Sequence, residues 1–260
     1  MVELSHRVED GERLGALLWE FGPGWRMISS AMLGGGIGPR EWVLNAQVVA
    51  GYSRMDPVEH LTELAPPGDG VGMMTAAFVE KYARASDGGV EAVATVGLRV
   101  PTWAAAPEGV EDQELRPIRV GTINIIVAVP VAMSDAALVN TVMTVTEAKA
   151  QALVEVGFPG TGTASDAVCI AVRDRMAGEG NVRGRMAGDA NVRGRMADGG
   201  NVRDRMAEGV PDVRDRMAAG GGDAAAEELF GGPRSEWGAR IARAVHAAVL
   251  AGAKEWYAYK

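Results

Sequence analysis

Two loops of the chain carry residue types that could perform chemistry. The first runs from Ser29 to Arg40 and contains three consecutive glycines, Gly34 to Gly36. Such glycines let backbone N–H groups approach an anion closely. The stretch lacks the Gly-Lys-Ser/Thr of a P-loop and the glycine spacing of a dinucleotide-binding turn. It is therefore either a glycine-rich surface turn or a ligand-binding loop of another kind.

The second loop, residues 160–166, reads GTGTASD. It brings hydroxyls, flexible backbone donors and a carboxylate into seven residues, as an active-site loop requires, although an ordinary turn uses the same residue types. A nearby helical stretch carries Thr144, Glu147 and Lys149. Thr144 and Glu147 are three residues apart and share a helix face, whereas Lys149 points elsewhere. A solvated helix face explains these three residues adequately.

The three histidines offer one good general base. His6 lies near the terminus and His60 in a short amphipathic helix, which leaves His246. The stretch around His246 is apolar on all sides, which predicts burial, and a buried histidine is more often a core residue than a catalyst. Because no two histidines have ligand spacing, the sequence argues against metal-dependent hydrolysis.

The elements that must position these residues alternate between strands and helices. Apolar, β-branched runs predict strands at 42–52, 71–78, 90–98, 122–131 and 167–172, and the run at 122–131 suits a central strand covered on both faces. Helices are predicted from Pro57, with Asp56 and Glu59 forming a capping box, from 136 to 156 after Ser134, and from 235 to 253. We expect an α/β or mixed α+β single domain, with a mixed sheet of about five or more strands packed by helices.

A low-complexity insertion interrupts this domain at residues 172–223. Five copies of a VRDRMA-like unit follow one another there with a period of ten and then eleven residues. One Val and one Met per unit cannot form a core, so the segment is predicted to be disordered. Its ten Arg are nearly balanced by acidic residues, which makes it a poor nucleic-acid arm. The folded domain then comprises residues 1–171 and 224–260.

Composition narrows the function further. The formal net charge of −8 argues against nucleic acid as a partner. The acidic N-terminal residues do not resemble a signal peptide, and the longest apolar run, 123–133, is too short to span a bilayer. The lone Cys169 excludes an internal disulfide. We expect a cytoplasmic protein without nucleic-acid or membrane partners.

Several longer segments resemble the adenosylcobinamide amidohydrolase family. They include MISSAMLGGGIGPREWVLNAQV, GVGMMTAA, GTINIIVAVPVAMSDAALVNTVMTVTEAKAQAL and GTGTASDAVCIAV, in the order of the family. The resemblance implies an enzyme that hydrolyses the amide joining the aminopropanol arm to the corrin ring, giving adenosylcobyric acid and aminopropanol in cobalamin salvage. A non-catalytic corrinoid carrier or sensor remains the alternative, and so does an amidohydrolase acting on a complete cobamide.

Amide hydrolysis needs an activated nucleophile and hydrogen-bond donors for the oxyanion. We select candidate residues by their ability to fill one of these two roles. Glu147 or Asp166 would activate water or a hydroxyl, and glycine N–H groups would hold the oxyanion. The candidate catalytic residues are Glu147, Asp166, Thr161, Thr163 and His246. The candidate substrate-binding residues are Ser29, Ser30, Gly34, Gly35, Gly36, Asn45, Asp87, Asn124, Gly160 and Gly162. The corrinoid is the substrate, no cofactor is expected to be required, metal dependence stays open, and a homo-oligomer is possible.

Overall fold

The computed structural model describes residues 1–108, 121–175 and 227–258. The repeat segment 172–223 lies outside these residues except for its first four, and so does the domain boundary at residue 224. The Pro-rich connection at 101–117 is described only as far as residue 108.

The larger of two sheets has six strands in the order β4-β3-β10-β9-β8-β7. Its two central strands, β9 and β10, are parallel, and the other neighbours are antiparallel. All six residues of β9 are buried, which confirms the predicted central strand. The strands are β3 (Trp25–Ser29), β4 (Gly36–Pro39), β7 (Ala83–Asp87), β8 (Val90–Val96), β9 (Ile123–Ala128) and β10 (Ala167–Arg173).

The smaller sheet has four strands in the order β1-β2-β5-β6. They are β1 (Val2–Glu9), β2 (Glu12–Glu20), β5 (Trp42–Gln47) and β6 (Gly70–Thr75). Strands β1 and β2 form a hairpin whose turn residues Asp10 and Gly11 both have positive φ, as a two-residue hairpin turn requires. Strands β5 and β6 are parallel, so their carboxyl ends meet at one edge.

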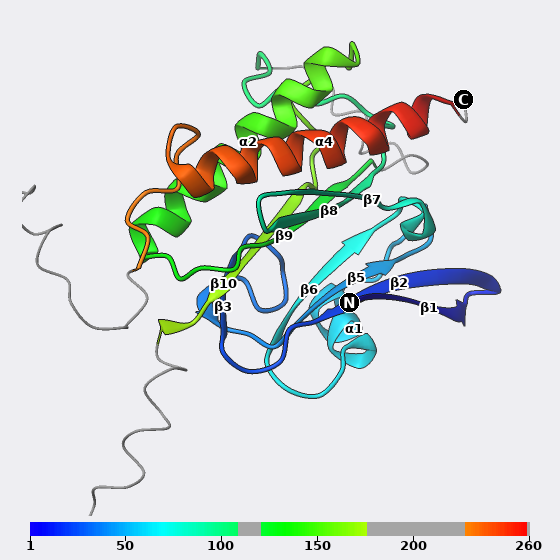
Figure 1. Ribbon diagram of the computed structural model, residues 1–260. Coiled ribbons are helices and arrows are strands. Elements are labelled where there is room, and N and C mark those ends of the chain that lie inside the picture. The colour runs from blue at the N-terminus through cyan, green and yellow to red at the C-terminus, as the bar shows by residue number, and fades with distance from the viewer. Residues whose placement is uncertain (109–120, 176–226, 259–260) are drawn as a thin grey trace, which may run out of the picture.

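The sheets and helices form four layers (Figure 1). Helices α2 (Asp135–Glu155) and α4 (Glu236–Ala258) pack on one face of the six-stranded sheet through a large apolar cluster. The opposite face packs on the four-stranded sheet. Helix α1 (Pro57–Leu64) covers the outer face of the smaller sheet around Leu61, and a 3-10 turn, η1, spans Val79–Lys81.

The mixed α/β class and the six-stranded mixed sheet confirm the expectation from sequence, whereas the second sheet was not predicted. Ser134 caps α2 by accepting a hydrogen bond from the N–H of Ala137 at 3.2 Å, as its position indicated. The capping box at α1 was wrong: Asp56 makes no side-chain cap and instead accepts hydrogen bonds from Arg54. Strand β5 also ends at Gln47, so Tyr52 lies in the following loop.

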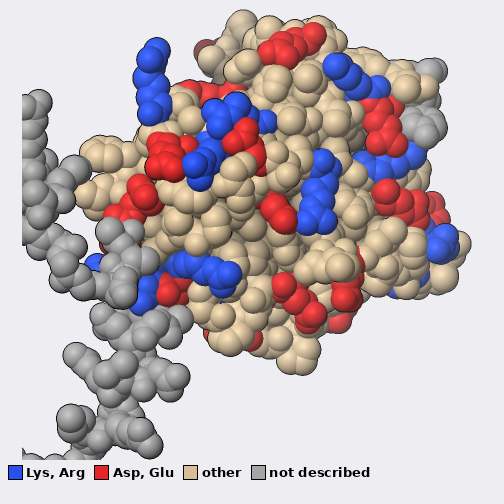
Figure 2. Space-filling view, viewed as in Figure 1, with Lys and Arg blue, Asp and Glu red and all other residues tan. Residues whose placement is uncertain are grey.

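Among the described residues, no helix is both long and apolar enough to cross a bilayer. The face seen in Figure 2 carries acidic and basic side chains interspersed among uncharged ones.

Candidate active site

Strand ends from both sheets meet at one place in the fold. The carboxyl ends of the parallel pair β5 and β6 face the carboxyl end of β3 and the amino ends of β9 and β10. A cleft of about 510 Å³ opens there. Because residues beyond a strand end leave the hydrogen-bonded ladder, their side chains and backbone groups can face a ligand. Open α/β sheets commonly bind ligands at the carboxyl ends of parallel strands, which β5 and β6 present here.

The cleft wall combines an apolar surface with a few polar groups, as small-molecule sites usually do. The apolar part comes from both sheets and from the loop after β5, and includes Met32, Val48, Val49, Met73, Met74 and Ala167. The polar part consists of Ser30, Tyr52, Thr75, Thr122, Ser165 and Asp166. Two of the predicted site residues, Ser30 and Asp166, therefore line one cleft although they are far apart in sequence.

Asp166, which directly precedes β10, is the most strongly held polar group of the cleft. Its Oδ1 accepts hydrogen bonds from the N–H of Ile123 at 2.9 Å and from the hydroxyl of Thr163 at 2.6 Å. Its Oδ2 accepts from Lys149 Nζ at 2.5 Å and from the N–H of Thr163 at 3.2 Å. These donors occupy the acceptor capacity of a carboxylate. Asp166 is therefore suited to fix the ends of β9 and β10 in place.

The Lys149–Asp166 pair is buried, with 11% of each side chain exposed. It packs directly against Gly162, where an added Cβ would meet both Lys149 Nζ and Asp166 Oδ2. The glycine is therefore needed for space. Gly160 has a similar role, because its Cβ would lie 2.8 Å from the backbone of Thr102. Thr161 also joins this contact by donating its N–H to the carbonyl of Thr102 at 2.9 Å.

Two hydroxyls among the cleft-lining residues accept a backbone hydrogen bond and keep their own hydrogens for donation. Ser30 Oγ accepts the N–H of Val168 at 3.1 Å, and Thr75 Oγ1 accepts the N–H of Ala77 at 3.0 Å. Because each oxygen serves as an acceptor, its hydrogen can point into the cleft. Ser29, by contrast, is turned inward: its hydroxyl donates to the carbonyl of Val168 at 2.9 Å.

A chain of buried polar side chains links the two sheets behind the cleft. Asn45 Nδ2 donates to Thr95 Oγ1 at 2.9 Å, and Asn124 Nδ2 donates to Asn45 Oδ1 at 2.8 Å. Asn124 also donates to the carbonyl of Met74 at 2.9 Å, on a strand that ends at the cleft. Each of the three side chains is about 1% exposed. Asn45 and Asn124 thus fix the relative position of β5, β6 and β9.

Helices α2 and α4 place other predicted residues away from the cleft. Glu147 is exposed on α2 and does not line the cleft. Thr144 and Lys149 are buried, which corrects the interpretation of all three as a solvated face; Thr144 donates to the carbonyl of Gly231 at 2.8 Å. His246 is only half-buried, because α4 has an exposed side, and its Nε2 lies 3.0 Å from Glu155 Oε2.

The three glycines of the first loop and Asp87 also lie outside this cleft. Gly34 has a φ of +69° and packs so closely on β6 that a Cβ would overlap the carbonyl of Gly70. Gly36 is exposed and starts β4, and Gly35 precedes it. Asp87 ends β7, where both its oxygens accept hydrogen bonds from Arg243 of α4, at 2.7 and 2.8 Å. The Arg243 guanidinium lowers the pKa of the Asp87 carboxyl.

Sequence reasoning missed Lys149, Thr75 and Tyr52. Lys149 could have been found, because it lies four residues after Val145 on the apolar side of the helix, where a lysine needs a buried partner. Thr75 and Tyr52 carried no such signal, since the cleft arises from strands that the sequence did not place together.

Cys169, on β10, does not act as a nucleophile. It is fully buried, and burial raises the pKa of its thiol to about 12. Within the described ranges, no cluster of three or more His, Cys, Asp or Glu side chains could hold a metal ion.

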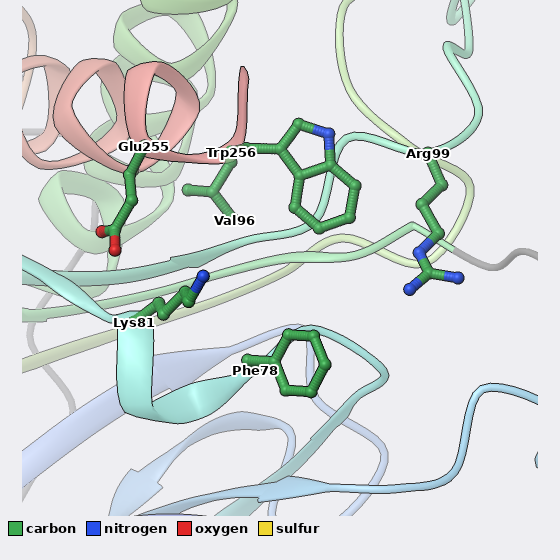
Figure 3. A pocket seen from close by; sticks show the side chains of 7 residues that line it. Phe78, Lys81, Val96, Arg99, Glu255 and Trp256 are labelled. Atoms are coloured by element: carbon green, nitrogen blue, oxygen red, sulfur yellow. The ribbon is translucent and has the colours of Figure 1, made fainter. Parts of the chain in front are cut away.

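A second, smaller hollow of about 190 Å³ lies between α4, β8 and η1 (Figure 3). Trp256 and Phe78 supply its rings, and the guanidinium carbon of Arg99 lies 5.7 Å from the Trp256 ring centroid. Lys81 and Glu255 also line it. None of the predicted site residues takes part, so the larger cleft is the better candidate.

Comparison with known proteins agrees with the resemblance noted from the sequence motifs. A family model described as adenosylcobinamide amidohydrolase matches residues 1–210. The adenosylcobinamide amidohydrolase of Methanosarcina mazei is 33% identical over 147 residues, which cover 55% of this chain and 67% of the relative. That of Halobacterium salinarum is 38% identical over 109 residues, covering 41% of this chain and 46% of the relative. Because the family model spans most of its length, this chain belongs to the adenosylcobinamide amidohydrolase family.

Proposed function

We propose that the chain hydrolyses the amide that joins the aminopropanol arm to the corrin ring of adenosylcobinamide, giving adenosylcobyric acid and aminopropanol. The observation that carries this proposal is the cleft itself, which combines a broad apolar wall with hydroxyl donors and a fixed carboxylate. The family names supply the substrate and the reaction class. The products and a place in cobalamin salvage follow from the bond that is cut.

The apolar wall suits a large ring system, and the open cleft allows the bulk of a corrinoid to remain outside while its arm enters. Met32 and Met74 are well suited to such a surface, because methionine side chains adapt to irregular shapes. The arm then places its amide near the ends of β3, β6 and β10.

The hydroxyls of Ser30 and Thr75 are the donors for the amide oxygen. An amide carbon attacked by water becomes tetrahedral and its oxygen gains negative charge, which prepositioned donors stabilise. Asp166 keeps the ends of β9 and β10 in place through Ile123, Thr163 and Lys149. We assign Asp166 and Lys149 this positioning role.

The test is incubation of the purified protein with adenosylcobinamide, followed by mass spectrometry of the corrinoid. We expect the rate of adenosylcobyric acid formation to be proportional to the enzyme concentration. Ser30→Ala and Thr75→Val each remove one hydroxyl donor. Each single substitution should lower kcat about 100-fold, the usual cost of losing an oxyanion donor. Tight binding without product would instead indicate a corrinoid carrier or sensor. If the enzyme preferred a complete cobamide in direct competition with adenosylcobinamide, the substrate would be the cobamide and the reaction would still be amide hydrolysis.

A further inference from the structure

His60 is a buried titratable side chain next to the cleft that the proposed function does not yet use. It is 2% exposed and lies on α1. Its Nδ1 shares a hydrogen bond of 3.1 Å with the hydroxyl of Tyr52, and Tyr52 lines the cleft. Its Nε2 lies 3.2 Å from Glu9 Oε1. The three side chains therefore form a continuous path from the cleft into the small sheet.

The inner end of this path is fixed by Arg7, which shares β1 with Glu9. Arg7 Nε donates to Glu9 Oε2 at 2.8 Å, and a second guanidinium nitrogen donates to the carbonyl of Gln47 at 2.7 Å. Gln47 is the last residue of β5, the strand whose end borders the cleft. The Glu9 carboxylate is thus held beside His60 by a guanidinium that binds its Oε2 atom and is itself anchored to the backbone.

The chemistry of the partners sets the direction of the hydrogen bonds. A carboxylate only accepts, so Glu9 favours the imidazole tautomer with its hydrogen on Nε2. In that tautomer Nδ1 is an acceptor, and the Tyr52 hydroxyl donates to it. The phenol oxygen then keeps its lone pairs for a second hydrogen bond. Burial raises the pKa of Tyr52, so its hydroxyl stays protonated and can pass a proton on.

We propose that Tyr52, His60 and Glu9 form the proton relay of the cleft, with Tyr52 as a catalytic residue and His60 and Glu9 as positioning residues behind it. The proposal rests on the proposed amide hydrolysis. The relay supplies the general base for the reaction. Asp166 cannot fill that role, because its oxygens are already occupied by hydrogen-bond donors.

The relay balances over one turnover. In the first step, the oxygen of a water molecule bonds to the amide carbon and gives one proton to Tyr52 Oη, while the Tyr52 hydroxyl proton moves to His60 Nδ1. Glu9 stabilises the resulting imidazolium. In the second step His60 returns its proton to Tyr52, and Tyr52 passes its own proton to the leaving nitrogen as the carbon–nitrogen bond breaks. The products are a carboxylic acid and an amine, and the relay is restored.

The relay works only while His60 is neutral before the reaction, so kcat is expected to fall on the acid side of the pH profile. The charged groups around His60 are Glu9, Asp56 and, through Glu9, Arg7. Near Tyr52 the charged groups are Arg54, Asp56, Glu9 and Glu63.

The experiment measures kcat, corrinoid affinity and the pH profile for the wild type and for Tyr52→Phe, His60→Asn and Glu9→Gln. Tyr52→Phe keeps the ring and removes only the hydroxyl; we expect kcat to fall about 100-fold or more, with the affinity unchanged. His60→Asn should lower kcat by a similar factor. It should also abolish the acid limb, that is, the fall of kcat on the acid side of the pH profile. Glu9→Gln keeps an acceptor and should lower kcat less, about tenfold.

Glu63→Gln is the matched control, because it removes a carboxylate from α1 that pairs with Arg54 and does not touch His60. It should keep the wild-type kcat and pH profile. Should His60→Asn fail to fold, Tyr52→Phe decides alone. Full kcat in a folded Tyr52→Phe protein, or an acid limb that persists in His60→Asn, would overturn the relay and leave the hydrolase intact. A wild type that forms no product would overturn the proposed function and the relay together.

Discussion

The two faces of the six-stranded sheet are built from the same strands but differ in chemistry. Toward α2 and α4, β9 presents Ile123, Ile125 and Val127 to an apolar cluster. Toward the small sheet it presents Ile126 and Ala128, and then Asn124 at the end that borders the cleft. The helix face therefore contributes stability, whereas polar groups are concentrated on the other face, at the strand ends where a substrate can reach them.

The comparison predicts that the largest loss of stability comes from breaking the buried ion pair at the strand ends. Lys149→Met leaves the Asp166 carboxylate buried without its cation, which should lower the free energy of unfolding by about 3–5 kcal/mol. Urea denaturation measures this. Adding Asp166→Asn to the same protein should restore part of the loss. A loss below about 1 kcal/mol would mean that the pair behaves like an exposed one.

A substitution on the helix face should cost stability without affecting the chemistry. Ile125 is fully buried beneath the helices, so Ile125→Ala should lower the free energy of unfolding by about 2–5 kcal/mol. Below its unfolding temperature the variant should bind and cleave the corrinoid as the wild type does. A selective loss of kcat in the folded variant would show that the two faces are not independent.

The polar chain between the sheets should give an intermediate effect on stability. Asn45→Ala removes the partner of Thr95 and of one Asn124 hydrogen, and unpaired buried groups cost about 1–3 kcal/mol. Because Asn124 also holds Met74 near the cleft, the same variant should weaken corrinoid affinity. Denaturation and a binding titration on one sample test both statements. Unchanged corrinoid affinity would show that these buried polar side chains do not influence the cleft.

The smallest effect is expected at the far edge of the sheet, where Asp87 joins Arg243. Because the pKa of Asp87 is lowered in the folded protein, its contribution is present above the ordinary aspartate range and is lost as the pH falls through the folded pKa. Thermal unfolding of Asp87→Asn should therefore occur slightly below that of the wild type at neutral pH, and the two should converge in acid. If the difference between the two unfolding temperatures instead widened in acid, the stabilising effect of the Asp87 carboxylate at neutral pH would be contradicted.

The sequence predicted the elements whose patterns are local. The β9 run and the Ser134 cap both appear where the residues indicated. No strand was predicted in the first 39 residues, yet they form four, because strand formation depends on the packing of a strand against its partners more than on its own residues.

The cleft itself was beyond local reasoning. Ser30 and Asp166 were singled out by residue type, and the structure brings them together because β3 and β10 are antiparallel neighbours. Tyr52, His60 and Glu9 come from a loop, a helix and a strand of the second sheet. Only the packing of that sheet places them beside the cleft.

Amide hydrolysis in the cleft at the strand ends can be checked with one pair of carboxylate variants. Asp166→Asn and Glu91→Gln each replace a carboxylate by an amide, the first in the cleft and the second in an exposed pair with Arg84. At a temperature where both are folded, adenosylcobyric acid formation should be lost in Asp166→Asn and unchanged in Glu91→Gln. Wild-type turnover by folded Asp166→Asn would contradict the account.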